Sequence, residues 1–129
     1  TIGDVTAANV AVVDDAFGVV ERFWRTPEDF VDHAIGTLVW VEEELAGICY
    51  AAAVADRRAE IDVLTKPAFR QRGLGKLLVN GFVARCAARS VAPLWDCYTN
   101  NVGSMALCNA IGFRAPAPPY SFFTIPRRP

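Results

Sequence analysis

Residues 60–78 read EIDVLTKPAFRQRGLGKLL and combine the sequence features of a strand, a turn and the start of a helix. Residues 60–66 contain three β-branched side chains and stop at Pro67, which cannot donate to a central ladder, so they predict a strand. From Gly73 to about Ser90 the chain is mostly apolar and predicts a helix buried over much of its surface. The turn between strand and helix is basic and holds two glycines, and the rest of the fold is arranged around it.

A strand, a basic turn and a helix in this order predict an anion-binding site at the turn. The backbone N–H groups of the turn and the positive end of the helix dipole converge on one point. The spacing excludes two familiar phosphate motifs, because Leu77 stands where a P-loop needs Ser or Thr and Leu78 where a dinucleotide fingerprint needs its third glycine. The alternative is a tight left-handed turn that uses glycine only for its geometry.

The flanking sequence predicts the order α–β–β–β–α–β–α–β, an α/β or α+β sheet with helices packed on it. Residues 7–25 are largely helical in pattern, with an interruption near Gly18. A further helix begins with Thr26 as its N-cap and Pro27 at its first position, and Gly36 is expected to end it. Strands are expected at residues 37–43, 46–55 and 93–98, a short helix at 101–111, and one or two strands after it.

Length and composition limit the class of protein. The 129 residues are expected to form one domain, 1–129. The net charge of −1 gives no footprint for a nucleic-acid partner. No membrane partner is expected either, because the longest apolar run, residues 45–55, is far shorter than the roughly 18 residues that suggest a span. The beginning of the chain does not resemble a signal peptide, so a cytoplasmic location is expected.

A metal cofactor is not expected. The only histidine is His33, and the cysteines at positions 49, 86, 97 and 108 form no C-x-x-C pair. In a reducing compartment these thiols stay free, and most of them are expected in the core.

Two motifs in the same order resemble those of the GNAT superfamily of N-acetyltransferases. Arg70-x-x-Gly73-x-Gly75 is similar to the loop that binds the acyl-CoA pyrophosphate, and NVGSMALCNAIGF (101–113) resembles the second conserved block. The similarity covers about residues 24–125, and EDF…AIG with P-x-W-D is similar to a bacterial acetyltransferase subgroup of unsettled substrate. The resemblance implies a mixed, mostly antiparallel sheet with a central splayed strand pair and flanking helices.

The resemblance also implies where acetyl-CoA binds. The backbone of residues 63–65 would hold the pantetheine arm, and one N–H there can serve as the oxyanion donor. The turn would hold the pyrophosphate, and Asn101 would contact the pantetheine or the acyl end. The residues assigned to acyl-CoA binding are Val63, Leu64, Thr65, Arg70, Gln71, Arg72, Gly73, Leu74, Gly75, Lys76, Asn101 and Ser104.

Acetyl transfer also needs groups that move protons. A lysine-like acceptor has a pKa of ~10.4, so its deprotonation at neutral pH costs roughly 4–5 kcal/mol. Asp96 occupies the family's usual base region and Glu60 is a second candidate, although Asp96 could equally be a structural carboxylate that caps the next turn. Cys108 replaces a tyrosine that in relatives can protonate the leaving thiolate. A thiol with a pKa near 8.5 could do the same, or Cys108 could simply fill space in the core.

The first strand of the superfamily is expected to be missing, because residues 1–6 are too few to supply it. An unpaired sheet edge would favour a homodimer. The main functional hypothesis is an N-acetyltransferase that moves an acetyl group from acetyl-CoA to a primary amine by direct attack in a ternary complex. The alternatives are a non-catalytic acyl-CoA-binding or regulatory module of the same fold and a structural or partner-binding domain. No feature of the sequence identifies the amine acceptor.

Overall fold

The computed structural model describes residues 1–95, 106–107 and 112 of the chain. The chain divides into two compact units, Thr1–Asp96 and Cys97–Pro129. In the second unit, residues 106–107 are helical and lie inside the helix predicted at 101–111, and Gly112 has a left-handed φ of 100°. All the elements named below belong to the first unit.

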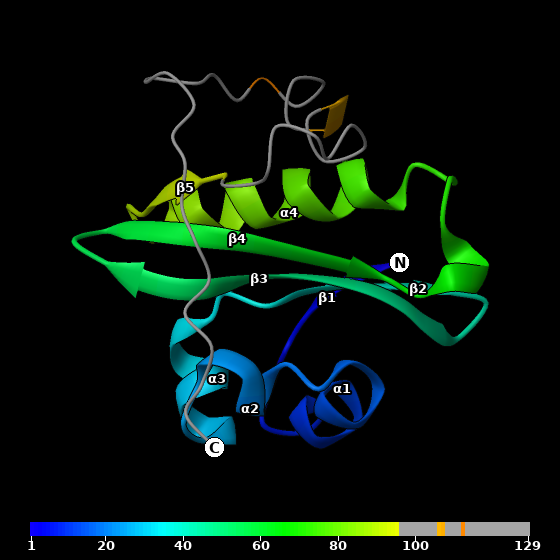
Figure 1. Cartoon of the computed structure of the whole chain (residues 1–129), viewed down its shortest axis with the longest axis horizontal. Coiled ribbons are helices and arrows are strands. Elements are labelled where there is room, and N and C mark those ends of the chain that lie inside the picture. Colours follow the sequence, from blue (N-terminus) through cyan, green and yellow to red (C-terminus); the bar gives the residue numbers. More distant parts are fainter. Residues whose placement is uncertain (96–105, 108–111, 113–129) are drawn as a thin grey trace, which may run out of the picture. The chain divides into compact units, whose positions relative to one another are not determined.

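The first unit is a five-stranded sheet with helices on both faces (Figure 1). The elements in chain order are β1 (Ile2–Asp4), α1 (Val10–Phe17), α2 (Val20–Phe23), α3 (Pro27–His33), β2 (Thr37–Val41), β3 (Glu44–Ala55), β4 (Arg58–Thr65), the 3-10 turn η1 (Pro67–Phe69), α4 (Leu74–Ala88) and β5 (Ala92–Leu94). Helices α1, α2 and α3 lie on one face of the sheet and α4 lies on the other (Figure 1). No helix in the described part of the chain is long and apolar enough to cross a bilayer.

The sheet has the order β1-β2-β3-β4-β5 and is antiparallel except at one pair, which confirms the predicted mixed and mostly antiparallel fold. The exception is β4–β5, whose parallel ladder joins residues 58–60 to residues 92–94. Strand β4 continues for five residues beyond this ladder, to Thr65. This is the place in the sheet where the splayed strand pair is expected.

The expectation that the first strand is missing is wrong. Strand β1 pairs with β2 in antiparallel register, with Ile2 opposite Val39 and Asp4 opposite Thr37. Two contacts hold this three-residue strand against β2 and α4. A Cβ on Gly3 would lie 2.7 Å from the Trp40 ring, so only glycine lets the strand pass there. Asp4 also forms an ion pair with Arg85 of α4, which holds β1 to the sheet.

The start of the helical region follows its sequence. Gly18 adopts a left-handed φ of 64° and separates α1 from α2, as predicted. Thr26 is the N-cap of α3, and its Oγ1 accepts a hydrogen bond from the Asp29 N–H at 3.1 Å. Pro27 occupies the first helical position.

The end of α3 differs from its prediction. The helix stops at His33, and the residue with positive φ is Ile35, at 55°, rather than Gly36. Gly36 is needed for packing instead, because a Cβ there would lie 2.4 Å from Val5 Cγ2. A positive φ is strained for a β-branched residue, and the burial of Ile35 (3% exposed) fixes it in place.

The backbone next to a bulge in β3 anchors the layer of helices α1–α3 to the sheet. The β3–β4 register shifts between Ala51 and Ala53. Both backbone polar groups of Ala51 bond to the helical layer. Its N–H donates to the Ala34 carbonyl at 2.7 Å, and its carbonyl accepts from Trp24 Nε1 at 2.9 Å. The chain on either side of α3 is therefore anchored to the middle of the sheet.

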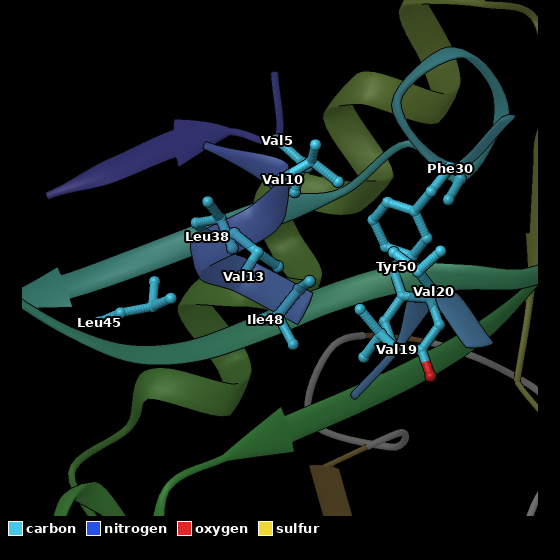
Figure 2. Packing of buried hydrophobic residues seen from close by; sticks show 11 residues of the cluster. Val5, Val10, Val13, Val19, Val20, Phe30, Leu38, Leu45, Ile48 and Tyr50 are labelled. Atoms are coloured by element: carbon cyan, nitrogen blue, oxygen red, sulfur yellow. The ribbon is translucent and has the colours of Figure 1, made fainter. Parts of the chain in front are cut away.

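The main core lies between the sheet and helices α1–α3 (Figure 2). Val13 and Val19 from the helical layer meet Ile48 and Tyr50 of β3, and the Phe30 ring lies 5.5 Å from the Tyr50 ring. On the other face, α4 contacts β2, β3 and β4 and buries its own apolar residues, which include Leu78, Val79, Phe82 and Cys86. Both faces of the sheet are thus covered along β2 and β3.

Candidate functional site

The turn after β4 uses one of its two glycines, Gly73, for a left-handed backbone, while Gly75 lies in the first turn of α4. The chain leaves Thr65 through η1, and two residues of the turn have left-handed backbones: Gln71, with φ of 61°, and Gly73, with φ of 76°. Gly73 is the N-cap of α4. Among the described residues, a Cβ on Gly73 would meet nothing within 4 Å, so it is the backbone angle that favours glycine at this position.

The N-terminus of α4 presents backbone donors that have no hydrogen-bond partner among the described residues. Its first intrahelical bond runs from the Leu77 N–H to the Gly73 carbonyl at 3.3 Å. The N–H groups of Leu74, Gly75 and Lys76 precede that bond, and no side chain in the described part of the chain caps the helix. No acidic residue lies in the first turn, so the positive end of this 15-residue helix is not neutralised there. Such an end can hold a phosphate group.

The two arginines of the turn each contact a residue that precedes the turn. Arg70 Nε donates to the Thr65 carbonyl at 3.1 Å, and the Arg72 guanidinium lies over the Phe69 ring, 5.5 Å from its centroid. Lys76 is exposed in the first turn of α4. The structure therefore brings the predicted turn residues together as one basic, donor-rich loop at a helix N-terminus.

The three residues assigned to the pantetheine arm lie at the end of β4. Val63, Leu64 and Thr65 pair with Cys49, Ile48 and Gly47 of β3, and they are only partly buried. On their other side the β4–β5 ladder has already ended at Glu60 within the described residues. The arrangement fits a strand whose free edge binds a ligand through backbone groups.

The predicted proton-transfer groups have different outcomes. Glu60 is exposed on β4, opposite Ala53 of β3, and lines an open hollow of about 210 Å³. The other residues of this hollow are Ala53, Ala55, Asp56, Arg58 and Leu94. The remaining candidates, Asp96, Cys108, Asn101 and Ser104, lie outside the described residues.

A charged cluster that the sequence did not single out lies on the same strand. The Tyr50 hydroxyl donates to Asp62 Oδ2 at 2.5 Å, and Arg22 Nη1 of α2 lies 3.9 Å from the same oxygen. Burial, together with the hydrogen bond to Asp62, raises the pKa of Tyr50 above its usual range, so this phenol stays a donor even at alkaline pH. The alternation of acids at 60 and 62 is visible in the sequence, but the selection of Asp62 depends on its register with Tyr50.

Comparison with known proteins gives the family. The family model of the GNAT acetyltransferases matches residues 5–123, which is most of the chain. The chain belongs to the GNAT acetyltransferase family. The GNAT resemblance of the two sequence motifs is therefore confirmed at the level of the family.

Individual GNAT relatives agree in sequence and in fold. The uncharacterized N-acetyltransferase YdfB of Bacillus subtilis is 30% identical over 94 residues, which are 73% of this chain and 36% of YdfB. A GNAT-family acetyltransferase structure from Novosphingobium aromaticivorans matches with a TM-score of 0.72 and 26% identity, over 88% of this chain and 51% of that one. The chain thus spans about a third to a half of the length of these two relatives.

A solved structure of similar length has the same fold and was determined with a CoA-containing ligand. The structure is AAC(6′)-Iy in complex with a bisubstrate analogue that contains CoA. The match covers 97% of each of the two chains and has a TM-score of 0.73. Its sequence is only 15% identical, so it supports the fold and not the acceptor. The family that the chain belongs to is one of acetyltransferases, and the Bacillus relative is named an N-acetyltransferase.

Proposed function

We propose that residues 1–129 form one acyltransferase domain that transfers an acetyl group from acetyl-CoA to a primary amine by direct attack in a ternary complex. The observation that carries the proposal is the basic N-terminus of α4, which no described side chain caps. It follows β4 through η1 and a short turn, and residues 61–65 of β4 extend beyond the ladder with β5. A long anionic ligand with a pyrophosphate and an amide-containing arm matches both features at once. The proposed partners are a small-molecule or peptide amine in the cytoplasm.

Each part of the site has a role in this proposal. The loop from Arg70 to Lys76 binds the pyrophosphate through backbone N–H groups and side-chain cations. The backbone of residues 63–65 holds the pantetheine arm and supplies an N–H to the oxygen of the thioester. Asn101 and Ser104 contact the arm or the acyl end. No metal has a role in this proposal.

The chemistry balances without a covalent enzyme intermediate. The amine first loses a proton to a carboxylate, for which Asp96 and Glu60 are the candidates. Its lone pair then forms the C–N bond to the thioester carbonyl carbon. The C–S bond breaks and its electron pair leaves with the CoA sulfur, which takes a proton from Cys108 or from water. The nitrogen, positively charged after its attack, gives up its second proton to the solvent. The products are an amide and free CoA.

The loop is tested by Gly75→Asp, which places a side chain and a negative charge where the pyrophosphate would bind. An acidic residue in the first turn is favourable for the helix itself, so folding should survive. We expect the affinity for acetyl-CoA, measured by titration calorimetry, to fall by well over tenfold, which corresponds to more than ~1.4 kcal/mol. The matched control is Asn80→Asp, which adds the same charge at an exposed position farther along α4.

The control should bind acetyl-CoA as the wild type does. Equal affinity in a folded Gly75→Asp variant would remove the loop from the site. Release of CoA over a panel of amines separates the enzyme from the alternative module: binding without catalysed release from any amine would support a non-catalytic acyl-CoA-binding domain.

A further inference from the structure

An open charge pair lies on the sheet face that α1–α3 cover. Arg22 Nη1 and Asp62 Oδ2 are 3.9 Å apart, which is too long for a hydrogen bond. The Arg22 side chain is 55% exposed and the Asp62 side chain 29%. The described residues offer neither group another ion pair, so the guanidinium and the carboxylate both keep hydrogen-bonding capacity for a ligand.

Both charges are held by aromatic residues. The buried Tyr50 donates to Asp62 at 2.5 Å and is itself fixed by the Phe30 ring. The Arg22 guanidinium lies 5.6 Å from the centroid of the Phe23 ring. Phe23 is 51% exposed, so an apolar surface lies directly beside the two charges. The Asp62 carboxylate is therefore oriented by Tyr50 before any ligand arrives, which lowers the entropic cost of binding.

One member of the pair, Asp62, lies on β4, the strand that is proposed to hold the acyl-CoA arm. Alternate residues of a strand face opposite sides of the sheet. Leu64 packs against the core under α1–α3, so Asp62 and Glu60 face the same side. Asp62 directly precedes residues 63–65. A ligand held by Asp62 therefore lies over the part of β4 whose backbone is proposed to hold the acyl arm.

We propose that the Arg22–Asp62 pair binds the acceptor and that the acceptor is an α-amino acid. This proposal rests on the proposed function and names the class of its amine substrate. The ammonium group would bind Asp62, the carboxylate would bind the fork of Arg22, and an apolar side chain would lie against Phe23. Arginine is suited to carboxylates because its planar fork can donate two parallel hydrogen bonds.

The arrangement of charges disfavours other amine classes. A polycation, such as a polyamine or an aminoglycoside, would place further positive charge next to Arg22. A simple alkylamine would satisfy Asp62 and leave Arg22 without a partner. A zwitterion whose ammonium and carboxylate groups are attached to the same carbon complements both side chains, and its binding would replace the long contact between them.

The test compares each amino acid with its decarboxylated amine. CoA release is measured with acetyl-CoA and the proteinogenic amino acids, phenethylamine, 3-methylbutylamine, a polyamine and an alanyl peptide amide. In the wild type we expect kcat/KM for phenylalanine or leucine to exceed that of the matching amine by at least tenfold. Arg22→Met, which removes the charge but keeps most of the stem, should lower kcat/KM for the amino acid by about tenfold to a hundredfold, through KM, as expected for a charge-assisted hydrogen bond.

Controls separate this site from a general effect of charge or folding. Arg25→Met removes the same charge from an exposed position three residues away and should change nothing. Arg22→Lys should recover part of the affinity, because it restores the charge without the fork. In Arg22→Met the loss should be confined to amino acids, and kcat/KM for phenethylamine should not fall, because this amine has no carboxylate for Arg22 to bind. Tyr50→Phe, which removes the donor that orients Asp62, should raise KM for amino acids without changing the affinity for acetyl-CoA.

The outcomes distinguish this proposal from the proposed function. Failure to bind acetyl-CoA in calorimetry would overturn both. Binding of acetyl-CoA with turnover of the amines, the polyamine or the peptide amide, but no preference for amino acids, would overturn only the amino-acid acceptor. Bound acetyl-CoA without turnover of any amino acid would overturn it as well, and so would equal kinetics in Arg22→Met and Arg25→Met.

Discussion

Two thiols of the described region, Cys49 of β3 and Cys86 of α4, are fully buried and free. Burial raises the pKa of Cys49 well above its ordinary value. Burial also raises the pKa of Cys86 from 9.0 to about 11, against a smaller lowering by Arg89. The protonated, inert form of both thiols is therefore favoured by the fold.

The Cys86 shift predicts a pH dependence of stability. The folded state holds this proton more tightly than the unfolded chain, so its contribution is fully present below pH 9 and is lost as the pH rises towards 11. We expect the difference in free energy of unfolding between the wild type and Cys86→Ala to fall between pH 8 and pH 10.5. Urea titrations at the two values measure it. A difference that stays constant would mean that the Cys86 thiol titrates normally in the fold.

Residues whose role is local were predictable, and those whose role depends on register were not. Gly73 stands at a left-handed N-cap, which its position between a strand and a helix already indicates. Asp62 is one of two acids on β4, and nothing in its own segment distinguishes it from Glu60. The distinction comes from Tyr50, twelve residues away on the neighbouring strand, whose hydroxyl selects Asp62.

At the scale of elements, the junction between α3 and β2 predicts a packing effect. The backbone of Gly36 accepts a hydrogen bond from the Val5 N–H at 3.1 Å, and a Cβ on Gly36 would lie 2.4 Å from Val5 Cγ2. Val5 is 7% exposed, so its side chain has little room to move. We expect Gly36→Ala to lower the free energy of unfolding by about 1–3 kcal/mol, as overpacking does.

The cause is tested by a double-mutant cycle with Val5→Ala. Removing the Val5 methyl groups makes space for the new Cβ, so the double variant should be less destabilised than the sum of the single variants. Chemical denaturation of the four proteins gives the coupling energy. Strictly additive effects would assign the cost to the backbone of Gly36 rather than to its contact with Val5.

The same junction explains which elements the sequence could predict. The start of α3 is determined by adjacent residues, Thr26 and Pro27, and it was predicted correctly. The end of α3 and the existence of β1 are determined by contacts across the fold, with Val5 against Gly36 and Gly3 against Trp40. A three-residue strand that contains glycine and aspartate has no periodic pattern of its own, so only the surrounding sheet reveals it.

At the scale of the whole molecule, β1 changes the expectation for self-association. The homodimer expected from a missing first strand loses its basis, because β1 pairs with residues 37–39 of β2. The sheet edge in the described unit is then a strand of three residues, with Asp4 in an ion pair with Arg85. Short edges with charged residues are poor templates for pairing with another chain.

Removal of residues 1–5 should therefore create the edge that the intact chain lacks. This deletion exposes the backbone of β2 beside the buried residues Leu38 and Val39, and an apolar edge of this kind pairs readily with a second copy. In sedimentation velocity we expect the shortened protein to form more oligomer as its concentration rises. The intact protein should form no oligomer through this edge. Arg85→Met is the matched control, since it removes the ion pair with Asp4 and loosens β1 without deleting it. A shortened protein that stays folded and monomeric would show that β1 does not protect this edge. If the Arg85→Met variant associated to the same extent, the effect would be due to lost stability instead.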